Sequence, residues 1–515
     1  MVKYFLLLSG CLFCFRVYTQ TTWSADIAPI LYKNCTSCHR PEGIAPFSLL
    51  TYSEAKIKAG EIEEAALTEE MPPWPADDNY THFAGELVLT ADEKFAISKW
   101  IFDGLEAGDT ASVEMPHYNF GTSILDTVHT SFSIGEYVTQ YDYDEYRHFV
   151  IHTGFTEDKY FNIMEIIPGN WNLVHHVDMY LDPTGYSDSL DQLDPLAGFN
   201  EDTGWPNVVN YIGGWSPGSG PLFLPENWGI KIPVGSDFVV QIHYAPNNAG
   251  LTDSTRINFT FVDDIATVRE CEVSTPLYNP ISGSLYIPAD SIVTFKQRSS
   301  AMIGDKSFVA IMPHMHKLGQ SYKIWYETIE GDSIPVIDIP VWDFHWQYFY
   351  TFPSVMKVPD GARFHAIAVY NNTSDNPDNP NDPPIDVYEG AYTKDEILMT
   401  FMAYTDYEEG DEFIIIDSSF YFPLEIENQF DPAAFNLYPN PADNTVTITS
   451  SINLTADKLM ITDLLGRRYN NIKLQGNTSG KQFDHTIDIS NLPNGVYIVE
   501  IHSLNNIESK KLIVY

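Results

Sequence analysis

Short runs of β-branched and aromatic residues constrain the fold of this chain more than any other feature. Three of them stand at 237–244, 256–262 and 364–370, and turn-forming residues punctuate the same region, as at 216–220 and 359–361. Such runs predict β-strands, because these side chains pack well on a pleated surface. With 31 Tyr and 30 Phe along the chain, we expect a mainly β protein.

Changes of residue pattern divide the 515 residues into several domains. We expect a signal peptide at 1–20, a small helical domain at 21–113, tandem antiparallel β-sandwiches of jelly-roll-like form at 114–266 and 267–430, and a small C-terminal β-sandwich at 431–515. The two larger sandwiches are expected to join near 265–272.

The helical domain shows apolar residues at helical spacing at 61–67 and 91–101. Thr90 stands where an N-cap belongs, Glu93 follows three residues later, and Gly104 comes after the periodic run. This arrangement predicts a capping box at the start of the second helix and a stop at its end.

The charge balance narrows the range of partners. Asp and Glu number 70 against 28 Lys and Arg, which gives a formal net charge of −42. Nucleic acids and anionic membrane surfaces attract basic proteins, so this excess of acid argues against both as partners. The chain is nevertheless 44% hydrophobic, which excludes an acidic disordered tail.

Residues 35–39 read Cys-Thr-Ser-Cys-His, the C-x-x-C-H pattern that attaches c-type haem. The thiols of Cys35 and Cys38 bond to the porphyrin, and His39 supplies one axial nitrogen to the iron. A redox or zinc cysteine pair is the alternative. A zinc site needs four ligands, and no second cysteine pair follows the predicted leader. We therefore predict one covalently bound haem c in a cytochrome c domain at 21–113.

Two residues compete for the sixth position on the haem iron. Met71 lies 32 residues after His39 and is followed by two prolines, a spacing that resembles the methionine loop of small cytochromes c. A thioether opposite imidazole favours electron transfer. His82 is the competitor, and we favour Met71.

The cysteine content predicts a fold without disulfides. After the predicted leader only Cys35, Cys38 and Cys271 remain, too few to staple an exported protein. Cys271 is expected to be a small buried hydrophobic residue.

Histidines gather in the β region, where 11 of the 15 lie between 117 and 365. Three groups of these histidines stand in segments that suggest metal binding: His175-His176, His243, and the pair His314 and His316.

Residues i and i+2 of a strand share a face, so His314 and His316 can bind one metal together. Joint ligation by His175 and His176 requires a bulge, a strong twist or different ring nitrogens. Imidazole suits copper and zinc, with copper favoured by affinity; histidines that merely pack are the alternative.

The order of these histidines and their surroundings resembles the copper type II, ascorbate-dependent monooxygenases, the family of peptidylglycine alpha-hydroxylating monooxygenase and dopamine beta-monooxygenase. The segments that carry the resemblance are VHHVDMY at 174–180, IGGW at 212–215, LP at 224–225, QIHY at 241–244, PHMHKLG at 313–319, DFHWQ at 343–347, VYNNT at 369–373 and TKDE at 393–396. The resemblance implies two copper ions. His175, His176 and His243 would hold the electron-storing copper, and His314 and His316 the oxygen-activating copper.

One position departs from the family pattern. In that family a methionine directly after Asp-Glu completes the second copper site, whereas this chain has Ile397 there. Met399 lies two residues later on the same strand face and can substitute with a small register shift, while Met402 faces the other side. We expect Met399 to complete the site. Without a thioether, the second copper would bind weakly or fail to activate oxygen.

The resemblance implies an oxidoreductase that hydroxylates an aliphatic C–H bond, with O2 and two one-electron deliveries from an external donor such as an ascorbate-like reductant or a redox protein. The C-x-x-C-H motif adds the hypothesis that the haem supplies electrons to the coppers. Two alternatives stay open. One is a non-catalytic extracellular copper and haem electron-transfer or copper-binding protein, for which Ile397 argues; the other is a surface-binding module with structural histidines.

The C-terminal segment resembles the type A sorting domain of the type IX secretion system. The motifs are NLYPNPA at 436–442, ITDLLGRR at 461–468, IDISNLPNGVY at 487–497 and the final KKLIVY. The resemblance implies contact with the type IX secretion machinery and a secreted or cell-surface location in a Gram-negative, Bacteroidota-type bacterium.

Overall fold

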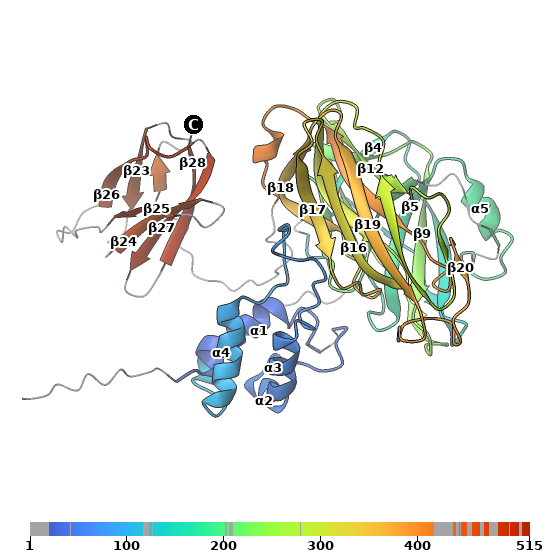
Figure 1. The fold of residues 1–515 in the computed structure, drawn as a ribbon, viewed down its shortest axis with the longest axis horizontal. Coiled ribbons are helices and arrows are strands. Elements are labelled where there is room, and N and C mark those ends of the chain that lie inside the picture. Colours follow the sequence, from blue (N-terminus) through green and yellow to red (C-terminus); the bar gives the residue numbers. More distant parts are fainter. Residues whose placement is uncertain are drawn as a thin grey trace, which may run out of the picture. The chain divides into compact units, whose positions relative to one another are not determined.

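In the computed structural model the chain forms two compact units, 1–424 and 425–515, which are described separately (Figure 1). The structure describes residues 20–416 apart from 42, 117–122, 126, 201–202, 205–209, 279 and 391, together with 436–438, 442, 444–450, 456–463, 468–472, 483–493, 495–503 and 507–514. The predicted signal peptide lies outside the described residues except for Gln20.

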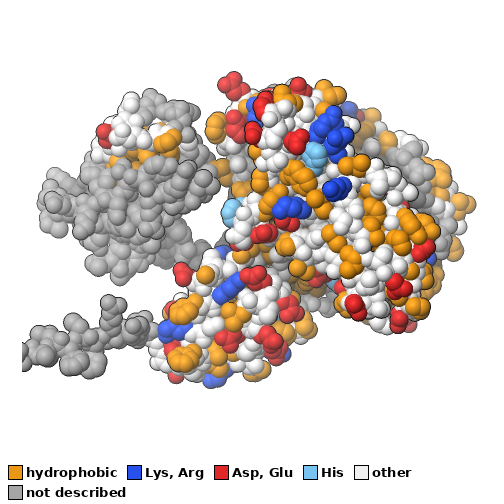
Figure 2. Space-filling model, in the orientation of Figure 1, with side chains coloured by type: hydrophobic (Ala, Val, Ile, Leu, Met, Phe, Trp, Pro, Cys, Tyr) orange, Lys and Arg blue, Asp and Glu red, His pale blue; other side chains and the backbone are white. Residues whose placement is uncertain are grey.

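Strands make up 39% of the chain and helices 13%, so the predicted mainly β class is confirmed. The division of the first unit into a cytochrome c domain and two sandwiches stays a prediction. None of the described helices has the length and hydropathy that a membrane span requires. On the face shown in Figure 2, acidic and basic side chains are scattered among apolar ones.

The N-terminal part of the first unit is helical. Its elements are η1 (Trp23–Ile27), α1 (Ala28–Asn34), α2 (Tyr52–Ile57), α3 (Ala59–Leu67), α4 (Ala91–Phe102) and η2 (Thr110–Ser112). The predicted capping box is present: Thr90 accepts from the Glu93 backbone N–H, and the Glu93 carboxylate accepts from that of Thr90. Trp23, Leu31 and Trp100 are almost fully buried in the core that these helices share.

The rest of the first unit, residues 123–416, is the β body, and its longest sheet runs through all of it. In spatial order the strands are β1 (Thr130–Ser133), β11 (Arg256–Phe261), β4 (Lys159–Ile167), β8 (Trp228–Ile232), β12 (Arg269–Tyr278), β21 (Met399–Asp406), β15 (Lys306–His314) and β18 (Tyr350–Val358), with β7 (Leu222–Phe223) beside β4. β8 and β12 pair in parallel, with Cys271 opposite Ile230. The sheet therefore continues without a break through the region where the sequence predicts a join.

Two four-stranded sheets pack against the two halves of this long sheet. The first contains β3 (Glu145–His152), β9 (Asp237–Tyr244), β5 (Val174–Asp182) and β6 (Asn210–Trp215). The second contains β14 (Ser291–Arg298), β19 (Arg363–Asn372), β16 (Gly319–Glu327) and β17 (Ser333–Ile339). Smaller elements are the pairs β2 (Tyr137–Val138) with β10 (Thr252–Asp253) and β13 (Tyr286–Ile287) with β20 (Val387–Tyr388), the helix α5 (Tyr186–Asp191) and the turn η3 (Asp411–Phe413).

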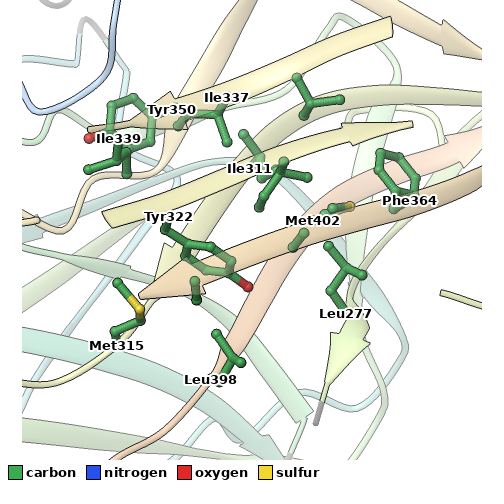
Figure 3. Close-up of a cluster of buried hydrophobic side chains, with 14 of the residues drawn as sticks. Leu277, Ile311, Met315, Tyr322, Ile337, Ile339, Tyr350, Phe364, Leu398 and Met402 are labelled. Carbon is green, nitrogen blue, oxygen red and sulfur yellow. The ribbon is translucent and has the colours of Figure 1, made fainter. Parts of the chain in front are cut away.

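Each sheet pair encloses its own hydrophobic core. In the core of the second half, Tyr322 and Phe364 from one sheet meet Ile311 and Met402 from the other (Figure 3). Cys271 is buried in the core of the first half, as expected. The three described cysteines form no disulfide.

The segment between α3 and α4 leaves the helices and packs on the β body. Ala76 and Phe83 are buried in the core of the second half of the β body. The backbone N–H of Ala84 donates to the carbonyl of Thr351 at 2.8 Å. Residues 73–84, called the 73–84 segment below, thus fasten the helical part to the β body.

The second unit consists of two antiparallel sheets around a small core. One contains β22 (Asn436–Tyr438), β23 (Thr445–Ser450) and β26 (Phe483–Asp488), and the other β25 (Arg468–Ile472), β24 (Ala456–Asp463), β27 (Gly495–Ser503) and β28 (Ile507–Val514). Ile448, Leu459, Val499 and Leu512 are fully buried between them.

Candidate metal centres

The first cluster consists of His175 and His176 on β5 and His243 on β9. The pairing of β5 with β9 shifts register between Val174 and His176, so that His176 stands opposite His243. A bulge of this kind lets adjacent side chains turn toward the same region. One ring nitrogen of each histidine lies within 4.8 Å of the others. The structure therefore brings together the three residues assigned to the first copper.

Burial keeps these imidazoles neutral. Desolvation lowers the pKa of His175 to about 3 and also lowers the pKa values of His176 and His243, with neighbouring histidines adding to the effect. His243 Nε2 lies 2.7 Å from Asp144 Oδ1. Its buried Nδ1 has no hydrogen-bond partner among the described residues. A neutral imidazole with one nitrogen held by a carboxylate and the other free is suited to metal binding.

The second cluster lies at the end of β15, where the His314 and His316 ring centroids are 5.3 Å apart and the rings are perpendicular, at 86°. Nδ1 of His314 is hydrogen-bonded to the Gln347 side-chain carbonyl. Nδ1 of His316 donates to the Asp395 carbonyl at 3.0 Å. Burial lowers the pKa of His314 to about 4 and that of His316 to about 3. Both rings are thus oriented through Nδ1, which leaves Nε2 for a metal.

Glu396 fixes the turn that carries the second cluster. It is fully buried and accepts the backbone N–H groups of His316 at 2.9 Å and Leu318 at 2.6 Å. In the sequence, Glu396 stands out only as the last residue of the TKDE motif at 393–396. The structure shows that this carboxylate replaces the backbone partners that the turn lacks.

Glu396→Ala is expected to lower the free energy of unfolding of the β body by about 1–3 kcal/mol for each buried N–H left without an acceptor. It should also weaken metal binding at the second cluster more than at the first. Denaturant unfolding and copper titration would measure both effects. Asp395→Ala is the matched control, since Asp395 binds His316 through its backbone; an equal loss in the two variants would contradict this role of Glu396.

Alternation along β21 decides which methionine faces the second cluster. Met399 is the cross-strand partner of His314, and with Ile397 it lines the cleft beside that histidine. Leu398 and Met402 point the other way, into the hydrophobic core (Figure 3). The structure therefore places Met399 on the side of His314.

A second thioether on this face was missed by the sequence analysis. Met312 lies two residues before His314 on β15, on the same strand face, and lines the same cleft. The Tyr211 hydroxyl donates to Met312 Sδ at 3.4 Å. The i, i+2 rule that linked His314 with His316 could have found it.

One cleft of about 740 Å³ joins the two clusters, and His176, His314 and His316 all line it. Phe344 stands between them, with its ring centroid 5.8 Å from that of His175 and 6.0 Å from that of His316. Polar side chains from both halves of the β body line the rest of the cleft: Asp178, Asn210, Tyr211, Gln241, Ser274, Thr275, Tyr278 and Glu389. The two clusters therefore face a shared cleft that can admit a small molecule.

The C-x-x-C-H motif lies at the end of α1. The thiols of Cys35 and Cys38 are free and half-buried, and burial raises the pKa of Cys35 to about 12. Nδ1 of His39 is 3.2 Å from the Phe47 carbonyl oxygen. That hydrogen bond orients the ring and leaves Nε2 available to a metal.

The two candidates for the sixth haem ligand lie in different surroundings. Met71 is half-buried in the turn after α3. The side chain of His82 is 69% exposed and pairs with Glu86 at 3.2 Å. Within the described residues, the structure records no hydrogen bond or ring contact between either candidate and His39.

Comparison with known families identifies the C-terminal segment. Residues 436–515 match the family described as secretion system C-terminal sorting domain. This match supports a secreted or cell-surface location in a Bacteroidota-type bacterium, so the predicted localisation is confirmed.

The chain is also similar to the tyramine beta-hydroxylase of Caenorhabditis briggsae. The two are 24% identical over 235 residues, which cover 40% of this chain and 36% of that relative. The matched region thus spans about a third of the relative's length.

Solved structures show only weak likeness. PNGase F, a glycosylasparaginase from Flavobacterium meningosepticum, aligns with a TM-score of 0.21 at 10% identity, over 57% of this chain and 95% of that one. The VP2 subviral particle of infectious bursal disease virus gives a TM-score of 0.17 at 10% identity, over 58% and 75%. Scores this low do not establish a shared fold.

Proposed function

We propose that this chain is an exported copper monooxygenase with a fused haem c domain. It hydroxylates an aliphatic C–H bond with O2 and two electrons delivered singly from an external donor. The observation that carries the proposal is the pair of imidazole clusters, each oriented by hydrogen bonds, that face one cleft. The similarity to tyramine beta-hydroxylase supports it.

The donor set of the first cluster fits copper. Three neutral imidazoles converge, and the buried Nδ1 of His243 has no partner among the described residues. His175, His176 and His243 would hold the ion, and Asp144 would keep the His243 ring in place. Imidazole nitrogen is a preferred ligand of copper.

The second cluster fits a copper ion with two imidazoles and a thioether. His314 and His316 would supply the nitrogens and Met399, opposite His314 on β21, the sulfur. When bound, copper at these two sites supplies one-electron redox chemistry and oxygen activation. Gln347 holds the His314 ring, and Phe344 packs against His175 and His316.

The C-x-x-C-H segment fits haem c. Cys35 and Cys38 would carry the covalent bonds, and His39, held by the Phe47 carbonyl, would be the axial ligand. We assign Met71 as the sixth ligand over the exposed and ion-paired His82.

A second function is favoured by Ile397, which lines the cleft where the family has its methionine. In this second function, the two clusters bind copper for extracellular electron transfer, and the protein has no catalytic activity. Reductant-dependent oxygen uptake coupled to a hydroxylated product separates the two functions.

Copper quantification combined with EPR spectroscopy of the full chain tests the proposal. We expect two copper ions per chain in the wild type and, in Met399→Ala, weaker binding and a changed signal for the second copper alone. Met312→Leu is the matched control, because it removes the neighbouring thioether. Loss of the second copper in Met312→Leu but not in Met399→Ala would overturn the ligand assignment, and absence of stoichiometric copper would overturn the function.

A further inference from the structure

A single loop contacts both histidine clusters. Residues 340–349 connect β17 to β18. Trp342 Nε1 donates to the His316 carbonyl at 3.2 Å, Phe344 packs on His175 and His316, and Gln347 holds the His314 ring. This 340–349 loop is therefore the structural link between the two candidate copper sites.

The same loop also contacts the helical part of the chain. Tyr348, next to Gln347, stacks on Trp74 of the 73–84 segment, with ring centroids 5.7 Å apart and an interplanar angle of 26°. The Tyr348 hydroxyl donates to the Pro73 carbonyl at 3.1 Å. Trp74 also packs edge-on against Tyr350 at 5.3 Å. The indole is thus held by several contacts in one orientation.

Trp74 and Tyr348 reach the C-x-x-C-H motif through a shared cavity. Both line a cavity of about 170 Å³ together with Cys38, Arg40 and Ile44. Cys38 is one of the two thiols assigned to haem attachment. The stacked pair therefore connects the cavity that Cys38 lines with the 340–349 loop, which holds the His314 ring.

We propose that the stacked pair Trp74–Tyr348 is the point at which electrons pass from the haem domain into the β body. The inference rests on the proposed function. One electron leaves the ferrous haem, which becomes ferric, and reduces a bound Cu(II) to Cu(I), with no proton transferred. The external reductant then restores the ferrous haem.

The contacts define a continuous route. From the Trp74 ring it crosses to Tyr348, follows covalent bonds to Gln347 and ends through the hydrogen bond to His314 Nδ1. Covalent bonds, hydrogen bonds and closely packed aromatic rings carry electrons better than gaps do, and every step from Trp74 to His314 is of one of these kinds.

A competing route starts from the same cavity. Trp171 lines it beside Cys38 and packs edge-on against Trp215 at 5.4 Å and 83°. Trp215 lines a smaller cavity with His175 and His176. The Trp74 route is favoured because it ends in a direct hydrogen bond to a ligand ring, and Trp171 provides a matched control.

The test follows single-electron transfer in the absence of oxygen and substrate. The full chain, loaded with haem and Cu(II), is mixed anaerobically with one electron equivalent of dithionite. Haem absorbance is followed by stopped flow and the Cu(II) signal by EPR. In the wild type we expect ferrous haem to form and then decay rapidly as the Cu(II) signal falls.

The variants separate the two routes. We expect Trp74→Leu to lose the rapid decay of ferrous haem, Trp74→Phe to retain it, and Trp171→Leu to behave as wild type. Haem spectrum and copper content should be unchanged in all three, and thermal unfolding of each variant is measured to confirm that it is folded under the conditions of the test. Wild-type decay in Trp74→Leu, or loss of rapid decay in Trp171→Leu, would overturn the role of the pair. Ferrous haem that persists in the wild type would instead overturn the haem coupling itself.

Discussion

Replacing His243 with alanine is expected to remove the first copper and leave the second bound. His243 lies at the centre of the first cluster, with its ring centroid 4.7 Å from that of His175 and 4.9 Å from that of His176. The variant loses one of the three imidazoles proposed as ligands of the first copper and leaves the Asp144 carboxylate without its partner. Copper content per chain should fall from two ions to one, and EPR should retain only the signal of the second site.

His152→Ala is the matched control for this variant. His152 lies on β3 in the same sheet, but its side chain is 68% exposed and pairs with Asp237 and Asp188. We expect no change in copper content. Retention of two copper ions by His243→Ala would contradict the assignment of the first site, as would an equal loss in His152→Ala.

Asp411→Ala is expected to lower the free energy of unfolding of the β body by about 3–5 kcal/mol, the usual cost of removing one partner of a buried ion pair. Two oxygens of Asp411 accept from the Arg269 guanidinium at 2.7 and 2.8 Å, and Ser307 donates to the same carboxylate at 2.6 Å. The Asp411 side chain is only 4% exposed and the Arg269 side chain 17%. The pair ties the start of β12 to the turn η3. Urea unfolding of the variant and the wild type measures the difference.

Asp406→Ala tests whether burial is the cause. Asp406 forms an ion pair with Lys306, but its side chain is 85% exposed, so we expect a change within about 1 kcal/mol. A loss of stability as large as that of Asp411→Ala would contradict the argument from burial.

The contribution of Asp411 should depend on pH. Burial acts to raise the pKa of this carboxyl, but hydrogen bonds from Arg269 and Ser307 outweigh it and hold the pKa below its ordinary value. The folded pKa therefore lies below the unfolded one, which is about 3.9. The stability difference between wild type and Asp411→Ala should be constant at neutral pH and shrink as pH falls below about 4. A difference that shrinks with rising pH would contradict this sign.

Local sequence patterns predicted several secondary-structure elements and the arrangement of some residues at the candidate site. Capping residues predicted the start of α4, and strand alternation separated Met399 from Met402. The two-residue period of a strand led to the expectation that joint ligation by His175 and His176 needs a bulge, a strong twist or different ring nitrogens, and the structure has an irregular register there. These features depend on residues close in sequence, so local reasoning can reach them.

Long-range pairing could not be read from local patterns. The parallel contact of β8 with β12 makes one sheet of the two halves, although the sequence suggested a join at that point. The 73–84 segment falls within the range predicted for the helical domain, yet Phe83 is buried in the core of the second half of the β body. Gln347 contacts His314 and Phe344 contacts His175 because the 340–349 loop packs beside β15 and β5, strands that are distant from it in the sequence.

Anomalous diffraction at the copper absorption edge from crystals of the copper-loaded chain tests the central claim most directly. The account predicts two peaks that are strong above the copper edge and fall sharply below it, unlike a peak from haem iron. One lies among the rings of His175, His176 and His243 and the other beside His314, His316 and Met399. A single peak, or copper bound away from the cleft, would contradict it.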